Sequence, residues 1–375
     1  MNKILKVCTF SLFVSIIFGA GSVLSDDDGN RPFRIFIDRD VNTFAVLPNG
    51  VRQPEGITAN LANGDIYVGT FTVPSKLLQY NRHGKLLATR DFPVQLLGLE
   101  FDRVYRKVYI TVTGDISGVA GAESKIQRVA ADLSQLEDVA IIKKVGAPAP
   151  REVVNPDDNS PQFPSIDTIT FGNNARVPNS MVFDRDGNLY ISDSFQGAVF
   201  KITNPSGCVP NCIMTQVVHD PLLATAGFPP FGANGLAFDI KETVLFVANT
   251  GDDRVLKISN PKSATPTVTV FAESINGADG IAFDERTGLL WVCANQADEV
   301  VALNDKGRIV AKLGEFHGIK RNGTPDGLLF PASLVIVDDE IFVTNLAVVL
   351  TGAPGDEPEE DVKLWTISRM KLPHH

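Results

Sequence analysis

Three stretches decide the fold: PNSMVFDRDGNLYISDSFQGAVFKI (178–202), ANGLAFDIKETVLFVANTGDDRVLKI (233–258) and ADGIAFDERTGLLWVCANQADEVVAL (278–303). Each has a small residue or Pro, then an amide or acid, then Gly or Ser. A short apolar strand ending in Phe-Asp follows, and then a turn and a second strand rich in β-branched and aromatic residues. A repeat of this kind is typical of a repeat architecture.

Three fainter copies complete the set: PEGITANLANGDIYVGTF (54–71), LLGLEFDRVYRKVYITVTGD (96–115) and PASLVIVDDEIFVTNLA (331–347). Six units of about 40 to 55 residues, each forming a four-stranded antiparallel sheet, predict an all-β, six-bladed β-propeller. The sixth unit lacks an outer strand before the chain ends. We expect the N-terminal segments RIFIDRD and TFAVLP to supply it and so to close the ring.

The N-terminal segment and the net charge indicate the location of the protein and exclude some partners. Lys3 and Lys6 precede an apolar run that is followed by small residues and three aspartates, which predicts a signal peptide over residues 1–25 and an exported single propeller domain over 26–375. After its removal no segment is long and apolar enough to span a membrane. The net charge of −10 argues against nucleic acid or an anionic membrane as partner. The sequence does not indicate an oligomeric state.

The second position of the repeats is occupied by Glu55, Leu97, Asn179, Asn234, Asp279 and Ser333. Equivalent positions of the innermost strands face the central channel of a propeller, so four side chains with carboxylate or amide oxygens would converge there. Asn and Asp before Gly are also common turn formers. Four in one register favour a divalent metal site, with calcium as the first choice and Mg or Mn also compatible with oxygen ligands.

At this point the sequence resembles the gluconolactonase and regucalcin (senescence marker protein) family, and more distantly diisopropylfluorophosphatase and paraoxonase. The resemblance covers about residues 50 to 350. It implies a calcium site in which Glu55 in QPEGI, Asn179 in VPNSM, Asn234 in GANGL and Asp279 in GADGI are the ligands. It further implies metal-assisted hydrolysis of a small lactone or other ester, with Asp279 as general base or nucleophile.

Other residues are weaker candidates. Asn249 and Asn295 end second strands and are possible pocket members, although propeller turns also favour Asn there. Ser333 in the ring and His317 in a loop complete the possible pocket. Cys208 and Cys212 flank Pro210-Asn211 and are either a small disulfide loop or free thiols; a metal pair lacks nearby partners. Cys293 lies in an apolar run.

Two insertions interrupt the repeats. Residues 147–176 form either a lid over the channel or a passive surface excursion, and the acidic residues 350–362 form either a flap or a solvated loop. The main alternative to a lactonase is a non-catalytic propeller that binds a small ligand or a protein. A third, weaker alternative is a propeller like strictosidine synthase, which uses a pocket without this metal quartet.

Overall fold

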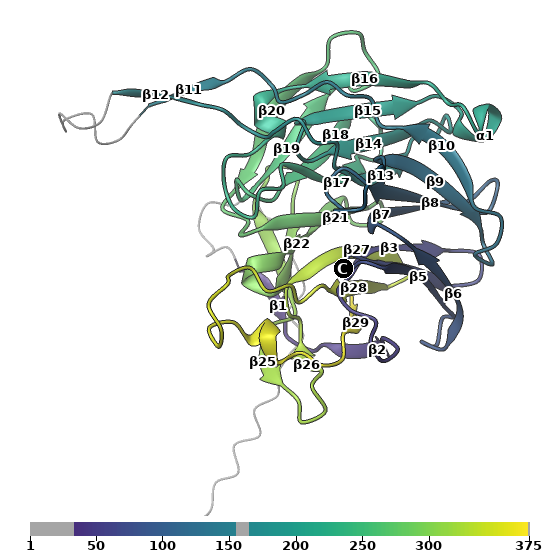
Figure 1. The fold of residues 1–375 in the computed structure, drawn as a ribbon. Coiled ribbons are helices and arrows are strands. Elements are labelled where there is room, and N and C mark those ends of the chain that lie inside the picture. The colour runs from purple at the N-terminus through teal and green to yellow at the C-terminus, as the bar shows by residue number, and fades with distance from the viewer. Residues whose placement is uncertain (1–33, 155–164, 374–375) are drawn as a thin grey trace, which may run out of the picture.

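The computed structural model describes residues 34–154 and 165–373. Six sheets form the blades around a central channel, as the repeats predicted (Figure 1). Each has four antiparallel strands, and one of the six has an additional parallel strand at its edge. The predicted signal peptide over residues 1–25 lies outside the described residues. In the described part of the chain, no helix has the length and apolarity that crossing a bilayer requires.

Each blade starts with its inner strand at the channel and ends at its outer edge. The strands of blades one to three are β3 (Pro54–Asn60), β4 (Asp65–Thr70), β5 (Ser75–Tyr80), β6 (Leu86–Phe92); β7 (Gln95–Asp102), β8 (Lys107–Thr113), β9 (Lys125–Ala130), β10 (Glu137–Ile141); β13 (Pro178–Phe183), β14 (Leu189–Asp193), β15 (Ala198–Ile202) and β16 (Met214–His219). The strands of blades four to six are β17 (Ala233–Phe238), β18 (Val244–Asn249), β19 (Arg254–Ser259), β20 (Thr267–Glu273); β21 (Ala278–Asp284), β22 (Leu289–Ala294), β23 (Glu299–Leu303), β24 (Ile309–Leu313); β27 (Pro331–Val337), β28 (Glu340–Asn345) and β29 (Thr366–Lys371).

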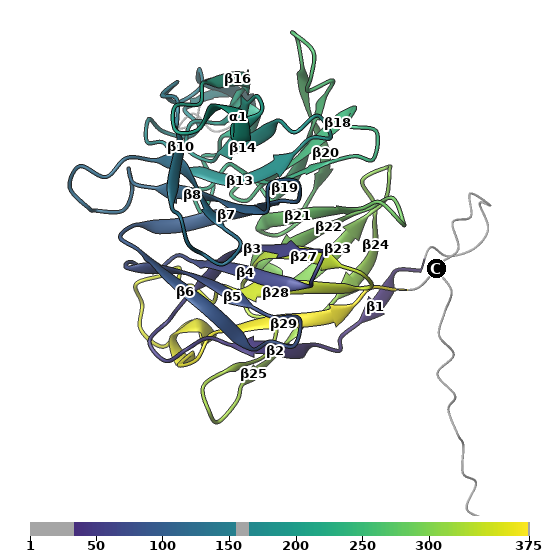
Figure 2. The ribbon, with the colours of Figure 1, turned by 90° about the vertical axis from the view of Figure 1, so that its right-hand side faces the viewer.

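The N-terminal segment closes the ring. The strand β2 (Asn42–Val46) pairs antiparallel with β29 and supplies the missing outer strand of blade six. The expectation that both N-terminal segments close this blade is wrong for RIFIDRD. Its strand β1 (Phe36–Asp38) instead adds to blade five, parallel to β24 (Figure 2). Phe36 packs against the apolar cluster of blades five and six, which explains why the segment docks there.

Aromatic side chains join neighbouring blades. The second strand of each blade carries one aromatic residue at the same position. Most of these aromatic residues contact the Phe of the Phe-Asp pair that ends the inner strand of a neighbouring blade. Tyr67 stacks on Phe101 at 5.6 Å, and Tyr190 meets Phe238 edge-on at 5.0 Å. The six aromatic residues are Tyr67, Tyr109, Tyr190, Phe246, Trp291 and Phe342. This repeated contact buries the faces between blades and fixes their order around the channel.

Glycine lets the inner strands approach one another closely. A Cβ on Gly56 would lie 1.9 Å from the carbonyl oxygen of Leu97, and one on Gly98 would lie 2.0 Å from the carbonyl oxygen of Asn179. Each glycine follows the second position of its own repeat and touches the second position of the next blade. The second positions are therefore neighbours around the channel.

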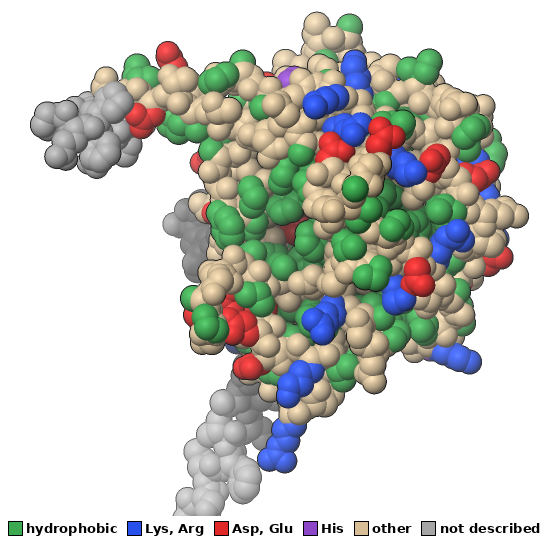
Figure 3. Space-filling view, in the orientation of Figure 1, with side chains coloured by type: hydrophobic (Ala, Val, Ile, Leu, Met, Phe, Trp, Pro, Cys, Tyr) green, Lys and Arg blue, Asp and Glu red, His purple; other side chains and the backbone are tan. Residues whose placement is uncertain are grey.

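Two pairs of strands lie outside the six blades in the described residues. The hairpin of β11 (Arg151–Val154) and β12 (Ile166–Ile169) projects away from the body (Figure 1). A smaller pair, β25 (Phe316–Ile319) and β26 (Pro325–Gly327), precedes blade six. On the face shown in Figure 3, Lys and Arg are interspersed with Asp and Glu, and hydrophobic side chains lie across the middle.

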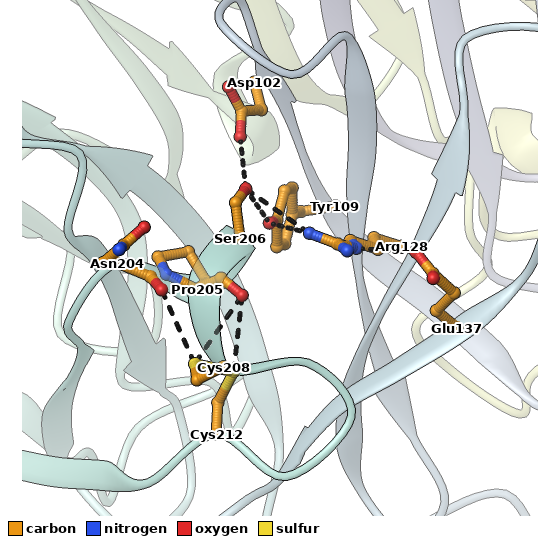
Figure 4. Close-up of a disulfide and its surroundings, with 9 residues drawn as sticks. All are labelled: Asp102, Tyr109, Arg128, Glu137, Asn204, Pro205, Ser206, Cys208 and Cys212. Atoms are coloured by element: carbon orange, nitrogen blue, oxygen red, sulfur yellow. Dashed lines mark hydrogen bonds and ion pairs between the residues drawn. A yellow bond between two sulfur atoms is a disulfide. The ribbon is translucent and has the colours of Figure 1, made fainter.

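The remaining elements are single turns: α1 (Pro205–Cys208), η1 (Pro221–Leu223), η2 (Asn295–Ala297) and η3 (Pro358–Asp361). At α1, Cys208 and Cys212 form a disulfide (Figure 4). The same turn places the Ser206 hydroxyl 3.1 Å from a carboxylate oxygen of Asp102, in blade two. The turn therefore links blade three to blade two.

Candidate metal site in the central channel

The four predicted ligands line one cavity at the start of the inner strands. Glu55, Asn179, Asn234 and Asp279 come from blades one, three, four and five, and all are nearly inaccessible to solvent. The cavity has a volume of about 180 Å³. Residues spaced over more than 220 positions of sequence are thus brought to one point, because the glycines described above draw the inner strands together.

Hydroxyl groups hold the two amides in orientation. The Asn179 Nδ2 donates to the Ser194 hydroxyl at 3.0 Å, and the Asn234 Nδ2 donates to the Thr250 hydroxyl at 2.9 Å. Ser194 and Thr250 follow the second strands of blades three and four. With each amide nitrogen engaged in this way, the Oδ1 atoms are left as the groups that can accept or coordinate.

The backbone of the ring is fastened by a second group of hydroxyls. Thr111, Ser192 and Thr344 donate to the backbone carbonyls of Asn179, Asn234 and Glu55 at 3.0, 2.6 and 2.6 Å. In each case a second strand of one blade binds the ligand residue of the next blade. This role was not predicted from the sequence, although a Thr or Ser stands at the matched place in KVYITVT, LYISD and EIFVTN.

The carboxylates show that the site is electrostatically incomplete by itself. Glu55 Oε2 and Asp279 Oδ1 are buried and have no hydrogen-bond partner. Burial, and then the charge of Asp279, raise the pKa of Glu55 well above its usual value. Burial raises the pKa of Asp279 to about 7, against the opposing effect of hydrogen bonds from Asn295 and Asn234. Two unpaired acceptor oxygens in one cavity are the arrangement that a bound cation would satisfy.

The donor set fits a hard divalent cation. Two carboxylates and two amide oxygens suit calcium, which takes six to eight oxygen ligands and completes its shell with water or substrate. Among the described residues no three His, Cys, Asp or Glu side chains come together as a metal-binding group. The amide oxygens of Asn179 and Asn234 are therefore required for any cation here.

Asn295 is a positioning residue for Asp279. Its Nδ2 donates to Asp279 Oδ2 at 3.0 Å. A Cβ atom added at Gly277 would lie 1.8 Å from the Asn295 Oδ1, so this oxygen lies against the backbone of Gly277. Asn295 lines the cavity, as the sequence suggested.

Asn249 does not line this cavity. Its Nδ2 donates to the carbonyls of Leu222 and Ala224 at 2.9 and 3.0 Å, and its Oδ1 accepts from the Asp252 N–H at 3.2 Å. These bonds hold the loop that precedes β17. Asn249 is therefore a turn residue rather than a pocket residue.

The prediction that Ser333 occupies the sixth ring position is wrong. Pro331 pairs with Asn345 and Leu334 with Val343, in the register that Ala233 and Leu236 have with Asn249 and Val247. The sixth ring position therefore belongs to Ala332, and Ser333 is equivalent to the glycine that follows. Ser333 lines a different cavity of about 940 Å³, which involves the later residues of the inner strands and neither carboxylate.

His317 also lies elsewhere. It is on β25, its side chain is 46% exposed, and it lies 3.5 Å from a Glu315 carboxylate oxygen. No described residue of 147–176 lines the cavity, so nothing in the described part of that insertion acts as a lid over it. Of the acidic insertion, only Leu350 reaches the cavity, beside Val348 and Val349.

Residues 172–314 match the family model described as the SMP-30/Gluconolactonase/LRE-like region. The resemblance to the gluconolactonase and regucalcin family is confirmed. The span matched by the SMP-30/gluconolactonase model contains Asn179, Asn234 and Asp279, whereas Glu55 lies before it.

Solved structures agree with the SMP-30/gluconolactonase match in fold. A calcium-binding protein, regucalcin, from Agrobacterium tumefaciens has 14% identity over 91% of this chain and 97% of that chain, with a TM-score of 0.57. A gluconolactonase from Xanthomonas campestris has 14% identity over 92% and 99%, with a TM-score of 0.53. A luciferin-regenerating enzyme has 12% identity over 86% and 92%, with a TM-score of 0.55. At these identities the likeness shows the fold alone. Comparison with curated protein sequences finds no match.

Proposed function

We propose that this chain is a lactonase-type hydrolase of small esters that uses a divalent cation, calcium in the first instance. The single observation that carries the proposal is the pair of unpartnered, buried carboxylate oxygens of Glu55 and Asp279 in one cavity with Asn179 and Asn234. The SMP-30/gluconolactonase match over residues 172–314 supports the reaction class. The names regucalcin and gluconolactonase belong to the similar structures and support the choice of cation and substrate type.

The residues divide the work as follows. A divalent cation bound there would polarise the ester carbonyl and stabilise the negative charge that develops on its oxygen. Glu55, Asn179 and Asn234 hold the ring geometry. Asp279 Oδ1 has no hydrogen-bond partner and is the atom that takes a proton from the attacking water. The water oxygen bonds to the carbonyl carbon, the bond to the ring oxygen breaks, and the proton passes to that oxygen to give the hydroxy acid.

We also propose that the chain is exported. Residues 1–25 carry the expectation, and the disulfide between Cys208 and Cys212 supports it, because disulfides persist in oxidising compartments. Detection of the mature protein outside the cytoplasm, starting near residue 26, tests this part of the proposal.

Metal analysis and hydrolysis assays test the function. The purified protein is expected to hold about one divalent ion per ring site and to hydrolyse lactones in a reaction that a chelator stops and calcium restores. Asp279→Asn is expected to abolish turnover while the β-sheet circular dichroism spectrum is retained. Ser333→Ala is the control, because Ser333 lines the other cavity. Activity retained in Asp279→Asn would overturn the mechanism, and bound calcium without turnover of any ester would favour the binding-protein alternative.

A further inference from the structure

The mouth of the ring cavity is apolar, which no repeat position predicts. Phe71, Phe228, Phe231, Phe330, Leu346 and Leu350 line it together with the ligand residues; these six residues are the apolar collar. They come from loops between strands and from the residues that flank β27 and β28. The lining of the cavity therefore combines two carboxylates with hydrocarbon surface.

The apolar collar has one rigid part. Phe330 and Leu346 are buried at 5% and 8% exposure and pack with Ala332, the sixth ring residue. Phe71 and Leu350 are partly buried against the same cluster. Ala332 thus joins this part of the collar directly to the ring. An apolar group that bound here would meet a preformed surface.

A second part of the apolar collar is more open. Phe231 packs against Phe195 with ring centroids 5.5 Å apart, whereas Phe228 is 59% exposed. The Asn249 hydrogen bonds to Leu222 and Ala224 hold the base of the loop that carries both phenylalanines. An exposed aromatic side chain at the mouth of a cavity leaves apolar surface in water that a ligand can cover.

The described residues that line the cavity offer few groups for a polar substrate apart from the ring oxygens, which the cation would engage. None is Lys, Arg or His. The lining hydroxyl, that of Thr250, accepts from Asn234 and donates to the Ala278 carbonyl at 2.8 Å. The Nδ2 atoms of Asn179 and Asn295 donate to Ser194 and Asp279. With the ring oxygens engaged by a cation, a substrate with several hydroxyls would place most of them against hydrocarbon without hydrogen bonds, which is unfavourable.

We propose that the substrate of this site is a lactone or ester that carries an alkyl or aryl chain, which the apolar collar holds while the carbonyl sits at the ring. Polyhydroxylated sugar lactones fit this cavity poorly. The proposal rests on the proposed function and names its substrate class. A cavity of about 180 Å³ is smaller than the usual range of about 300–1,000 Å³. It receives the reacting group, and the chain extends past Phe228.

A chain-length series on the calcium-loaded full chain tests this. The value of kcat/KM is expected to rise two- to fourfold per methylene from γ-butyrolactone to γ-nonalactone, since burial of one methylene is equivalent to about fourfold at most. Glucono-δ-lactone is expected to be the poorest substrate. Phe228→Ala is expected to lower kcat/KM about tenfold for γ-nonalactone and much less for γ-butyrolactone, which has no chain to contact Phe228. Tyr105→Ala is the matched control, because Tyr105 is 58% exposed and lines the other cavity.

A binding measurement separates this inference from the proposed function. δ-Lactams with methyl, propyl and pentyl chains, which resist hydrolysis, are titrated by calorimetry against the same proteins. Binding that strengthens with chain length and weakens in Phe228→Ala supports the apolar collar, even if no ester is hydrolysed and the proposed function fails. Efficient hydrolysis of glucono-δ-lactone, with lactam binding independent of chain length, overturns the inference and leaves the lactonase proposal standing.

Discussion

The Asn295 Nδ2 donates a hydrogen bond of 3.0 Å to Oδ2 of Asp279, and this bond leaves the opposite oxygen of the carboxylate without a partner. One side of Asp279 is therefore fixed by the protein, and the other is available for chemistry. Residues of this kind commonly change metal affinity or activity 10- to 100-fold when they are removed.

Asn295→Ala tests the positioning role. We expect kcat to fall about 10- to 100-fold at saturating calcium, because Asp279 would lose its orientation. The hydrogen bond from Asn295 lowers the pKa of Asp279, so its loss should raise that pKa and move the acidic limb of the kcat profile to higher pH. A lower kcat without a shift of that limb would indicate a merely structural effect.

Removal of calcium should make stability depend on pH in a defined direction. Burial raises the pKa values of Glu55 and Asp279 in the folded chain, so the folded state retains protons that the unfolded state releases. In chelator, stability is therefore expected to be greatest below the unfolded carboxyl pKa of about 4 and to fall as the pH rises towards 7. Calcium at about 100 times its Kd should restore about 2.7 kcal/mol at neutral pH.

Differential scanning calorimetry across pH 4 to 8, with calcium or chelator, checks this expectation. The double variant Glu55→Gln/Asp279→Asn is the control: its Tm should be insensitive to calcium and should depend less on pH than that of the calcium-free wild type over the same range. A wild-type Tm that calcium leaves unchanged at every pH would contradict the metal assignment.

Thr344→Val should weaken the closure of the ring. The Thr344 hydroxyl donates to the Glu55 carbonyl at 2.6 Å and accepts from the Ser333 N–H at 3.0 Å. Valine has a similar shape but satisfies neither group, so we expect a loss of about 1 to 3 kcal/mol in the free energy of unfolding. Urea unfolding measures it. Thr215→Val, which removes a hydroxyl bonded to the Lys201 carbonyl on an exposed strand, should cost much less.

The disulfide should stabilise the junction of blades two and three. It closes a loop of five residues, for which the chain-entropy model gives about 2 kcal/mol. The Cys208→Ser/Cys212→Ser variant is expected to lose about that amount, because α1 would no longer hold Ser206 against Asp102 and Tyr109. Reduction of the native protein should give the same loss in Tm, and equal stability of all three forms would contradict the role.

The sequence contained most of what determines the blades and the ring. The Phe-Asp pairs and the aromatic residue in the second strand of each blade reflect contacts that recur in four of the six blades, so their repetition was visible without coordinates. The four ligands were visible for the same reason. Ser333 was misplaced by one residue because the sixth unit has Ala-Ser where three of the other five units have a polar residue and Gly, and only strand pairing resolves that register.

Features formed between blades were harder to read. The roles of the Thr111, Ser192 and Thr344 hydroxyls cannot be predicted until the ring residue of the next blade is known to lie beside each of them. The apolar collar comes from loops that do not repeat, so no comparison between units could reveal it. The docking of β1 on blade five depended on the open edge of β24, which the one-dimensional pattern does not express.

The pairing of Asn42 with Arg369 joins residues more than 320 positions apart. During synthesis the β2 segment is made first and waits for its partner until the last blade emerges, so the entropy of closing the largest loop in the molecule is paid at the end. Moving the β2 residues behind β29 by circular permutation would turn this distant contact into a local hairpin. Such a chain should reach the same ring faster, whereas loss of a few C-terminal residues would leave the N-terminal strand without a sheet.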